Sequence, residues 1–181
     1  MKVISGKYKG REIFVPKSGV KPTSEKVKQA VINILNPYLK GAKFLDIFAG
    51  TGAVGIEALS NGASFCCFVE NNHKNYILLK KNLEIIIEDK NLYITIKHNA
   101  SRLTEFFKSR NIQPFEIIFA DPFYDDLSWI FDDIILLTED FLIKGGLFLL
   151  EHNSREKFDF HPLFIETRNY GDTSVSIFQK R

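Results

Sequence analysis

The sequence lacks the features that mark several structural classes. Its 181 residues include only two cysteines, Cys66 and Cys67, which are adjacent and cannot form a disulfide framework or a metal knuckle. No apolar run approaches the roughly 20 residues that a transmembrane helix needs, and the N-terminus has no apolar signal-peptide segment. The four histidines are scattered without metal-ligand spacing. These absences predict a cytoplasmic protein with reduced cysteines, no membrane contact and no metal.

The chain has little net charge, but its basic residues are concentrated in one segment. The chain is 45% hydrophobic and carries a net charge of only +2, which suits one well-buried domain. Residues 1–30, however, contain eight basic residues against two acidic ones, so they carry +6 and the rest carries −4. A localised basic segment is typical of contact with a polyanion. A lysine-rich edge that discourages sheet aggregation explains the same charge equally well.

The basic segment predicts a small β-hairpin over residues 2–15. Its turn holds Lys7, Tyr8, Lys9 and Arg11. Lysine and arginine neutralise phosphates, and a tyrosine between them can stack on an unpaired base. The alternative is an ordinary turn with exposed lysines. We expect residues 1–22 to extend a single domain whose core spans residues 23–181.

The stretch 44–55 is typical of a strand, a glycine turn and the start of a helix. Its apolar run resembles a buried parallel strand, and Asp46 interrupts that run at a cost unless something pairs with the carboxylate. Gly50 and Gly52 permit a tight turn and close approach of a ligand. A helix over residues 53–59 then directs its backbone N–H groups at the turn. Together these parts predict a nucleotide-sized site at the carboxyl end of the first strand.

The charge of Asp46 helps to decide between two candidate ligands for the glycine turn. Gly50, Gly52 and Gly55 also satisfy the dinucleotide pattern G-x-G-x-x-G, which is weak evidence in isolation. A carboxylate beside the turn would repel a pyrophosphate, whereas it suits the sulfonium and ammonium of S-adenosylmethionine (AdoMet). We therefore favour AdoMet over NAD. An NAD-dependent oxidoreductase is the rival, although no Tyr-x-x-x-Lys pair accompanies the glycines.

Two further strand ends predict contacts to the adenosine half of such a ligand. Glu70 follows the strand 65–69 and lies 18 residues beyond Gly52, where an acid suits ribose hydroxyls. We favour the ribose role, and the alternative for Glu70 is a helix N-cap in the run Glu70-Asn71-Asn72. Asn99, after the strand 92–97, could bind an adenine edge or be a plain turn residue. We leave the two interpretations of Asn99 open.

The remaining pattern alternates strands and helices. The expected strands are 44–48, 65–69, 92–97, 115–120 and 147–150, with a final hairpin of 164–168 and 174–178. We expect the first helix to begin at a cap on Thr23 or Ser24 and to end at Asn36-Pro37. Further helices are expected over 53–59, 72–87, 101–109 and 127–137, and Gly145-Gly146 should introduce the strand 147–150. This order predicts an α/β fold with a mostly parallel sheet.

The tetrapeptide Asp121-Pro-Phe-Tyr124 is the catalytic candidate. It directly follows the buried strand 115–120, and neighbouring strand ends share one crevice. The exocyclic amine of a nucleobase is a poor nucleophile, because its lone pair is delocalised into the ring. The Asp121 carboxylate and the Pro122 carbonyl could hold its two hydrogens, while Tyr124 and Phe123 stack on the base. The alternative is an ordinary turn after a strand.

With these motifs the chain resembles the RsmD family, bacterial 16S rRNA guanine-N2 methyltransferases of the AdoMet-dependent class I. The resemblance covers the whole chain and rests on residues 4–11, 21–23, 45–53, 55–58, 121–124, 145–146 and 170–173. It implies a Rossmann-like sheet of seven strands in the order 3-2-1-4-5-7-6, with the last strand antiparallel. It also implies AdoMet as methyl donor and 16S rRNA as acceptor, within a small-subunit particle and with a monomeric enzyme.

The resemblance also assigns roles to individual residues. The catalytic set is Asp121, Pro122, Phe123 and Tyr124. The cofactor-binding set is Asp46, Phe48, Ala49, Gly50, Thr51, Gly52, Glu70, Asn71, Asn99, Ala100 and Asp121. The RNA-binding set is Lys7, Tyr8, Lys9, Arg11, Lys21 and Thr23.

Three residues depart from the family pattern. Phe123 replaces a second proline and offers a stacking surface in place of rigidity. Lys21 replaces an arginine, which keeps the charge but loses the bidentate fork. Asn99 replaces an aspartate and is a weaker, neutral partner for adenine. Because a related Asn-Pro-Pro-Tyr motif serves adenine, an adenine-N6 methyltransferase is one alternative. A catalytically silent RNA-binding module that kept the fold is another.

Overall fold

The computed structural model describes residues 1–16, 25–123 and 127–181. Its seven strands form one sheet in the order β3-β2-β1-β4-β5-β7-β6, which confirms the predicted order. The strands are β1 Lys43–Ile47, β2 Phe65–Val69, β3 Tyr93–Ile96, β4 Phe115–Ala120, β5 Leu142–Asn153, β6 Phe164–Tyr170 and β7 Thr173–Gln179. β7 runs antiparallel to both of its neighbours, whereas the pairs among β1 to β5 are parallel.

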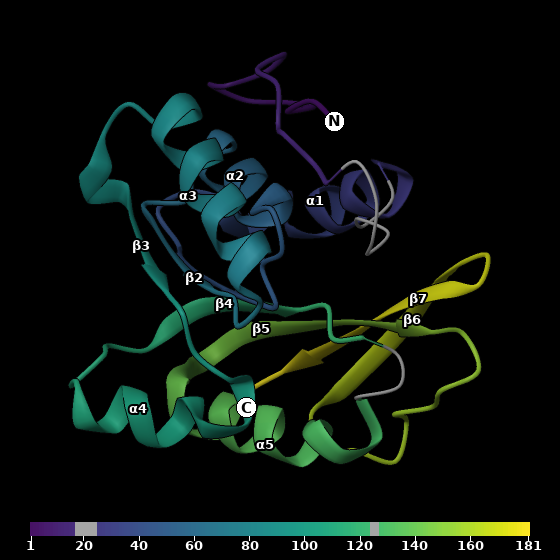
Figure 1. Cartoon of the computed structure of the whole chain (residues 1–181). Helices are drawn as coiled ribbons and strands as arrows, with labels where there is room; N and C mark the ends of the chain where they lie inside the picture. The colour runs from purple at the N-terminus through teal and green to yellow at the C-terminus, as the bar shows by residue number, and fades with distance from the viewer. Residues whose placement is uncertain (17–24, 124–126) are drawn as a thin grey trace.

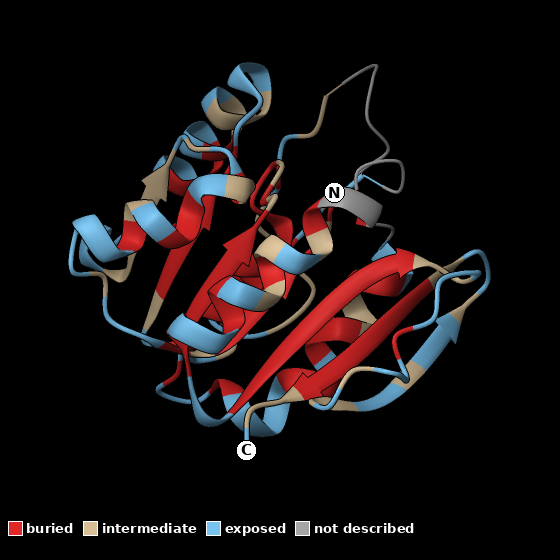
Figure 2. Cartoon of the chain, turned by 90° about the horizontal axis from the view of Figure 1, so that it is seen from below, coloured by how far each residue is buried: buried red, intermediate tan, exposed pale blue. Residues whose placement is uncertain are grey.

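Helices cover both faces of the sheet. They are α1 Glu25–Leu39, α2 Ala53–Ser60, α3 His73–Ile86, α4 Leu103–Ser109 and α5 Leu127–Phe141, with short 3₁₀ turns at Lys90–Leu92 and Ala100–Arg102. In Figure 1, α1, α2 and α3 lie on one side of the sheet and α4 and α5 on the other. Each face has its own apolar core. Figure 2 shows the central strands buried and the edge strand β6 largely exposed.

Two of the element boundaries that differ from the sequence-based prediction have a clear physical cause. Helix α1 continues through Pro37 to Leu39, whose side chain is fully buried. A proline in the last turn removes only one backbone donor, and burial of Leu39 stabilises that turn. Strand β5 begins at Leu142 rather than after Gly146, because a register shift against β4 accommodates both glycines within the strand.

The N-terminal segment, residues 1–16, packs against the helical layer instead of forming a regular hairpin. A single antiparallel bridge joins Lys2 and Glu12, and Val3 and Ile13 are both buried in the core. The segment therefore belongs to the folded body. Its position depends on long-range contacts that no local pattern in the sequence encodes.

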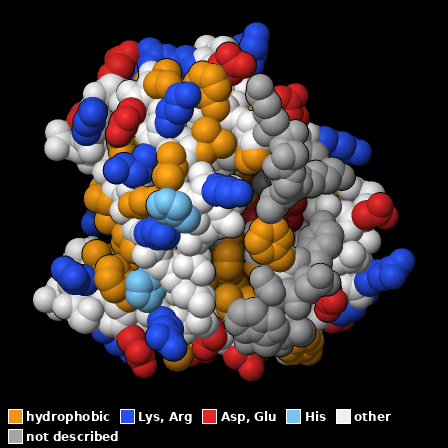
Figure 3. All heavy atoms as spheres, in the orientation of Figure 1, with side chains coloured by type: hydrophobic (Ala, Val, Ile, Leu, Met, Phe, Trp, Pro, Cys, Tyr) orange, Lys and Arg blue, Asp and Glu red, His pale blue; other side chains and the backbone are white. Residues whose placement is uncertain are grey.

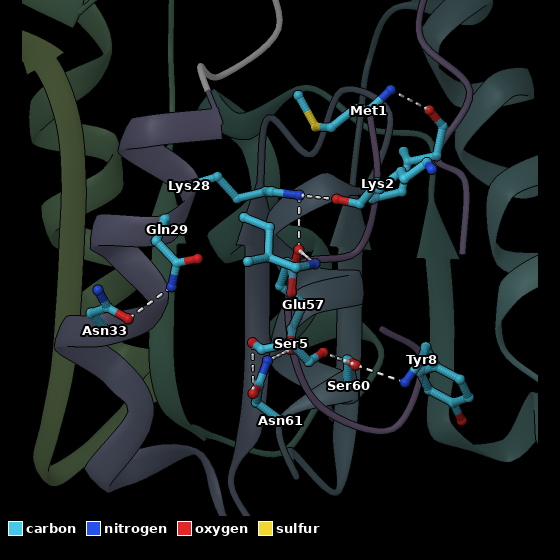
Figure 4. Close-up of polar contacts among 12 residues, drawn as sticks. Met1, Lys2, Ser5, Tyr8, Lys28, Gln29, Asn33, Glu57, Ser60 and Asn61 are labelled. Atoms are coloured by element: carbon cyan, nitrogen blue, oxygen red, sulfur yellow. Dashed lines mark hydrogen bonds and ion pairs between the residues drawn. The ribbon is translucent and has the colours of Figure 1, made fainter. Parts of the chain in front are cut away.

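A buried ion pair anchors this segment (Figure 4). Lys28 of α1 and Glu57 of α2 lie 2.8 Å apart with fully buried side chains. The Lys28 ammonium also donates to the carbonyl oxygen of Lys2 at 2.8 Å, and Glu57 accepts the Ile4 N–H at 2.6 Å. Each charge is thus paired and also bonded to the N-terminal backbone, which compensates part of its desolvation.

In the described part of the chain, no helix is both long and apolar enough to cross a bilayer.

Candidate active site

A cavity of about 730 Å³ opens at the carboxyl ends of the parallel strands. Its lining comes from the ends of β1, β2, β4 and β5, from α1 and from the turn between β6 and β7. In Figure 3, acidic side chains are visible deep in a hollow of this face. The volume falls in the range of ligand pockets, roughly 300–1,000 Å³. The sequence-based placement of a site at the strand ends agrees with this position.

The glycine turn forms one wall of the cavity. Gly50 and Gly52 have φ angles of +55° and +83°, and Phe48 also has a positive φ of +61°. A Cβ atom at Gly52 would lie 2.5 Å from Cδ1 of Leu79, so that side chain would have to shift, and the positive φ would strain any other residue at this position. Phe48, in a conformation uncommon for a non-glycine residue, carries local strain beside the cavity.

Asp46 lies beneath this turn and is almost fully buried, with 2% of its surface exposed. One carboxylate oxygen accepts the N–H of Gly55 at 3.0 Å, at the start of α2. Burial raises the pKa of Asp46 to about 8, and repulsion from Asp121 and Glu70 adds to this rise, although the Gly55 hydrogen bond opposes it. A cation in the cavity would relieve both causes, because it would replace lost hydration and neutralise the repulsion.

Glu70 joins the end of β2 to the glycine turn. Its two oxygens accept the Gly50 N–H at 2.8 Å and the Asn72 N–H at 2.6 Å. Burial raises the pKa of Glu70, and hydrogen bonds from three backbone N–H groups oppose that rise. Asn72 and not Glu70 is the N-cap of α3, so the N-cap alternative for Glu70 is wrong, although Glu70 accepts the N–H of that cap residue. Each carboxylate oxygen has a second lone pair, so these bonds leave capacity for ribose hydroxyls.

Strand register places three carboxylates on the same face of the sheet. Asp46 lies opposite Phe119 of β4, and Phe119 lies opposite Leu149 of β5. Side chains alternate along a strand, so Asp121 and Glu151, two residues further on, point to that same face. Both line the cavity. Glu151 is 5% exposed, and burial together with repulsion from Asp121 raises its pKa to about 9.

The cavity therefore has a strongly acidic wall. In the part of the chain that the structure describes, five carboxyl groups line it, four at the strand ends, from Asp46, Glu70, Asp121 and Glu151, and one from Asp172 in the turn between β6 and β7. No lysine or arginine lines it among the described residues. Within those same residues, no three His, Cys, Asp or Glu side chains are grouped so that they could hold a metal ion. The acidic wall favours an organic cation over a pyrophosphate.

Most of the predicted site residues border the cavity, and some do not. Those that line it are Asp46, Phe48, Ala49, Gly50, Thr51, Glu70, Asp121, Pro122 and Phe123, and Gly52 adjoins it as the N-cap of α2. Asn71, Asn99 and Ala100 do not line it. Asn99 is exposed and accepts the Ser101 N–H at 3.1 Å, so the structure favours its turn interpretation. Tyr124, Lys21 and Thr23 lie outside the described residues.

One predicted RNA contact of the N-terminal turn is wrong, and a second is shared with the protein itself. Tyr8 is 1% exposed and belongs to the core, so its ring cannot stack on a base. The Arg11 guanidinium is bonded to Glu88 and to the carbonyl oxygen of Ile86, which uses two of its five N–H donors within the protein. Lys7 and Lys9 are exposed, as predicted.

These lysines also lie far from the cavity. The Lys7 N–H donates to the carbonyl of Ser60, the last residue of α2, whereas the first residue of that helix borders the cavity. Eight helical residues span about 12 Å. Any polyanion that touches both places must therefore extend along α2.

Sequence reasoning missed several residues of the cavity wall. They are Asn75, Phe119, Glu151, Tyr170, Asp172 and Thr173. Glu151 carried a usable signal, since it directly follows the apolar run 147–150, as Asp121 follows the run 115–120. The turn at 170–173 belongs to the family resemblance but gave no sign of lining the cavity, because only the antiparallel pairing of β5, β7 and β6 brings it to this edge of the sheet.

Comparison with known families gives a consistent match. The profile described as Conserved hypothetical protein 95 matches residues 1–179. Among curated proteins, the chain is 34% identical to YlbH of Bacillus subtilis over the whole of both chains; that protein's name gives rRNA methyltransferase as an inferred activity. It is also 34% identical to ribosomal RNA small subunit methyltransferase D of Haemophilus influenzae, across 87% of this chain and 80% of that protein.

Solved structures share the fold. The Thermus thermophilus protein TTHA0928 superposes with a TM-score of 0.85 at 27% identity and covers 99% of each chain. The methyltransferase-like SMU.776, whose structure holds SAH, has a TM-score of 0.70 at 15% identity, with 84% of this chain and 49% of that chain covered. The second likeness concerns the fold alone. Both confirm the class I methyltransferase arrangement of the sheet.

Proposed function

The chain belongs to the Conserved hypothetical protein 95 family, the RsmD family of rRNA methyltransferases, and we propose that it transfers a methyl group from AdoMet to the exocyclic N2 amine of a guanine in 16S rRNA. The acidic cavity wall carries this proposal, because four carboxyl groups at adjacent strand ends suit a cationic ligand. The enzyme would work in the cytoplasm, on a small-subunit particle.

The residues at the β1–β2 end of the cavity fit AdoMet. Glu70, which lines this end, would hold the ribose hydroxyls, and Asp46 with the turn from Gly50 to Gly52 would hold the positively charged methionine end. The orientation of Asp46 is fixed by its hydrogen bond from Gly55. AdoMet supplies an electrophilic methyl group on its sulfonium. Asn71, Asn99 and Ala100 remain predictions for the adenine end.

The residues at the β4 end fit the acceptor amine. Asp121 and the carbonyl oxygen of Pro122 would accept the two N–H groups of the amine and so orient its nitrogen for attack on the methyl group. Proline stiffens this turn and removes a competing backbone N–H. Phe123 lines the cavity with 52% of its surface exposed, so its ring is available to stack on the base. Orientation and charge placement then supply most of the catalysis.

AdoMet affinity should increase between pH 6 and pH 8. In the free protein the Asp46 carboxyl is mostly protonated below its pKa of about 8, so binding of a cation must displace that proton. Affinity should therefore rise by up to about tenfold per pH unit across this range and then level off. Calorimetry in two buffers with different ionisation enthalpies measures both the affinity and the released proton.

The Asp46→Asn variant is the control for this pH dependence. Glu70 also has a raised pKa and contributes with the same sign, so the difference between the two proteins isolates Asp46. The variant should bind AdoMet more weakly and with a flatter pH profile. Identical profiles for both proteins would remove Asp46 from the cation site.

Lys7 and Lys9 are the exposed basic residues that we assign to RNA phosphates. Replacing both with alanine should weaken binding to small-subunit rRNA and reduce the salt-dependence slope by about 1.4–1.8, at 0.7–0.9 per phosphate contact. Replacing two exposed lysines elsewhere, Lys144 and Lys157, is the matched control and should leave the slope unchanged. Binding measured from low to moderate salt tests this. Equal slopes in all three proteins would limit Lys7 and Lys9 to solubility.

Mass spectrometry of 16S rRNA from a deletion strain tests the function as a whole. One methyl mark on a guanine N2 should disappear and return when purified protein and AdoMet are added to particles from that strain. Loss of a mark on an adenine amine would instead support adenine-N6 methylation. Calorimetric binding of NAD in place of AdoMet would support the oxidoreductase alternative.

A further inference from the structure

Glu151 occupies the end of the cavity opposite the glycine turn. The sheet order β2-β1-β4-β5 arranges the four carboxyl groups in a row, from Glu70 through Asp46 and Asp121 to Glu151. The glycine turn lies at the β1–β2 end of that row. Electrostatic coupling follows the same order, because Asp121 raises the pKa of Asp46 on one side and of Glu151 on the other. Glu151 therefore faces the acceptor side of Asp121.

The carboxyl group of Glu151 has unused hydrogen-bonding capacity. Its Oε2 atom is buried and has no hydrogen-bond partner among the described residues. A buried polar atom without a partner is costly, so its retention beside a cavity favours a ligand contact. With a pKa of about 9, the group is protonated at neutral pH. A neutral carboxyl offers one O–H donor and one carbonyl acceptor side by side.

We propose, on the basis of the function assigned above, that Glu151 recognises the guanine base by donating its O–H to guanine O6 and accepting the guanine N1–H. These two groups adjoin the N2 amine on one edge of guanine, so one base engages Asp121 and Glu151 together. The β4–β5 pairing of Ala120 with Leu150 places the two acids on neighbouring strand ends, as this requires. Glu151 is thus a specificity-determining residue of the reaction.

The same pairing disfavours adenine. If the adenine N6 amine lay against Asp121, the next positions along that edge would be the N1 acceptor and a C–H group. A protonated Glu151 could donate to N1 but its carbonyl oxygen would face carbon. Adenine therefore loses one hydrogen bond and leaves a buried acceptor unsatisfied, which sites of this kind discriminate against.

Two substitutions separate this role from a structural one. Glu151→Gln keeps a donor and an acceptor at the same positions, so methyl transfer to particles from the deletion strain should stay within a few-fold of wild type. Glu151→Leu keeps a similar volume without polar atoms, and kcat/KM for the particles should fall by about tenfold to hundredfold. Both variants should bind AdoMet like wild type. If Gln is as defective as Leu, or if AdoMet binding falls with methyl transfer, the proposal is wrong.

A base analogue tests the recognised atoms directly. 2-Aminopurine keeps the N2 amine but lacks both N1–H and O6. When it replaces guanine at the mapped nucleotide of reconstituted particles, wild type should lose about tenfold to hundredfold in rate, and Glu151→Leu should treat both bases alike. An undiminished preference for guanine in Glu151→Leu would overturn the assignment and leave the methyltransferase intact. If the wild-type protein methylates no particle, the proposed function is wrong, and this inference is wrong with it.

Discussion

Replacing Asp121 with alanine is expected to lower the single-turnover rate of methyl transfer by roughly 10²- to 10³-fold, with little change in AdoMet affinity. Asp121 lines the cavity between the residues assigned to the cofactor and Glu151. It is assigned to hold one hydrogen of the acceptor amine, and without it the nitrogen loses both its orientation and the negative charge that draws its lone pair out of the ring. Such an interaction acts on the transition state more than on cofactor binding.

The control for this experiment comes from the same strand. Glu116 lies near the opposite end of β4 and accepts the backbone N–H of Lys43. Glu116→Ala removes an equal charge from the same strand and should leave the rate nearly unchanged. Rapid-quench measurement with excess enzyme gives the rate, and calorimetry gives AdoMet affinity. A parallel loss of rate and affinity in Asp121→Ala would assign Asp121 to the cofactor instead.

Replacing Glu57 with leucine should reduce the free energy of unfolding by about 3–5 kcal/mol. The variant leaves the Lys28 ammonium fully buried, and among the described residues the carbonyl oxygen of Lys2 remains as its partner. It also removes the acceptor of the Ile4 N–H, so the N-terminal segment loses an anchor. For a domain with a stability of about 5–15 kcal/mol, this is a large fraction of the total. Urea unfolding followed by circular dichroism measures it.

Two further variants show whether burial of the charge is the cause. The double variant Lys28→Met/Glu57→Leu removes both charges and should recover most of the lost stability. Glu166→Ala breaks the half-exposed pair with Arg168 and should cost less than about 1 kcal/mol. A loss in Glu57→Leu as small as that of the surface variant would contradict the account, as would a double variant less stable than the single one.

The central strands show how much of the fold could be predicted. The bounds of β2 and β4, Phe65–Val69 and Phe115–Ala120, agree with the apolar runs in the sequence. Buried parallel strands have continuous apolar sequences, which makes them easy to recognise. The turn after β1 could be predicted because glycine readily adopts a positive φ. The order of the sheet followed from resemblance to a family rather than from the pattern itself.

The candidate site could be predicted where an acid lies in or directly after an apolar run. Asp46 stands out because a carboxylate is rare inside such a run, and Asp121 because it directly follows one; both line the cavity. Glu151 has the same signal as Asp121, but we expected its strand to end at Leu150 and gave Glu151 no role. The structure extends β5 through Asn153 and so directs Glu151 into the cavity.

The sequence by itself determined the class of fold, the glycine turn and the two acids on adjacent strand ends, because each depends on residues close together in the chain. Only the tertiary structure decided that Tyr8 is buried, that Arg11 pairs with Glu88, and that Glu151 completes the acidic wall. Those outcomes depend on contacts between segments far apart in sequence. Whether a basic or aromatic side chain is free to bind RNA is decided by what packs against it, which local patterns do not encode.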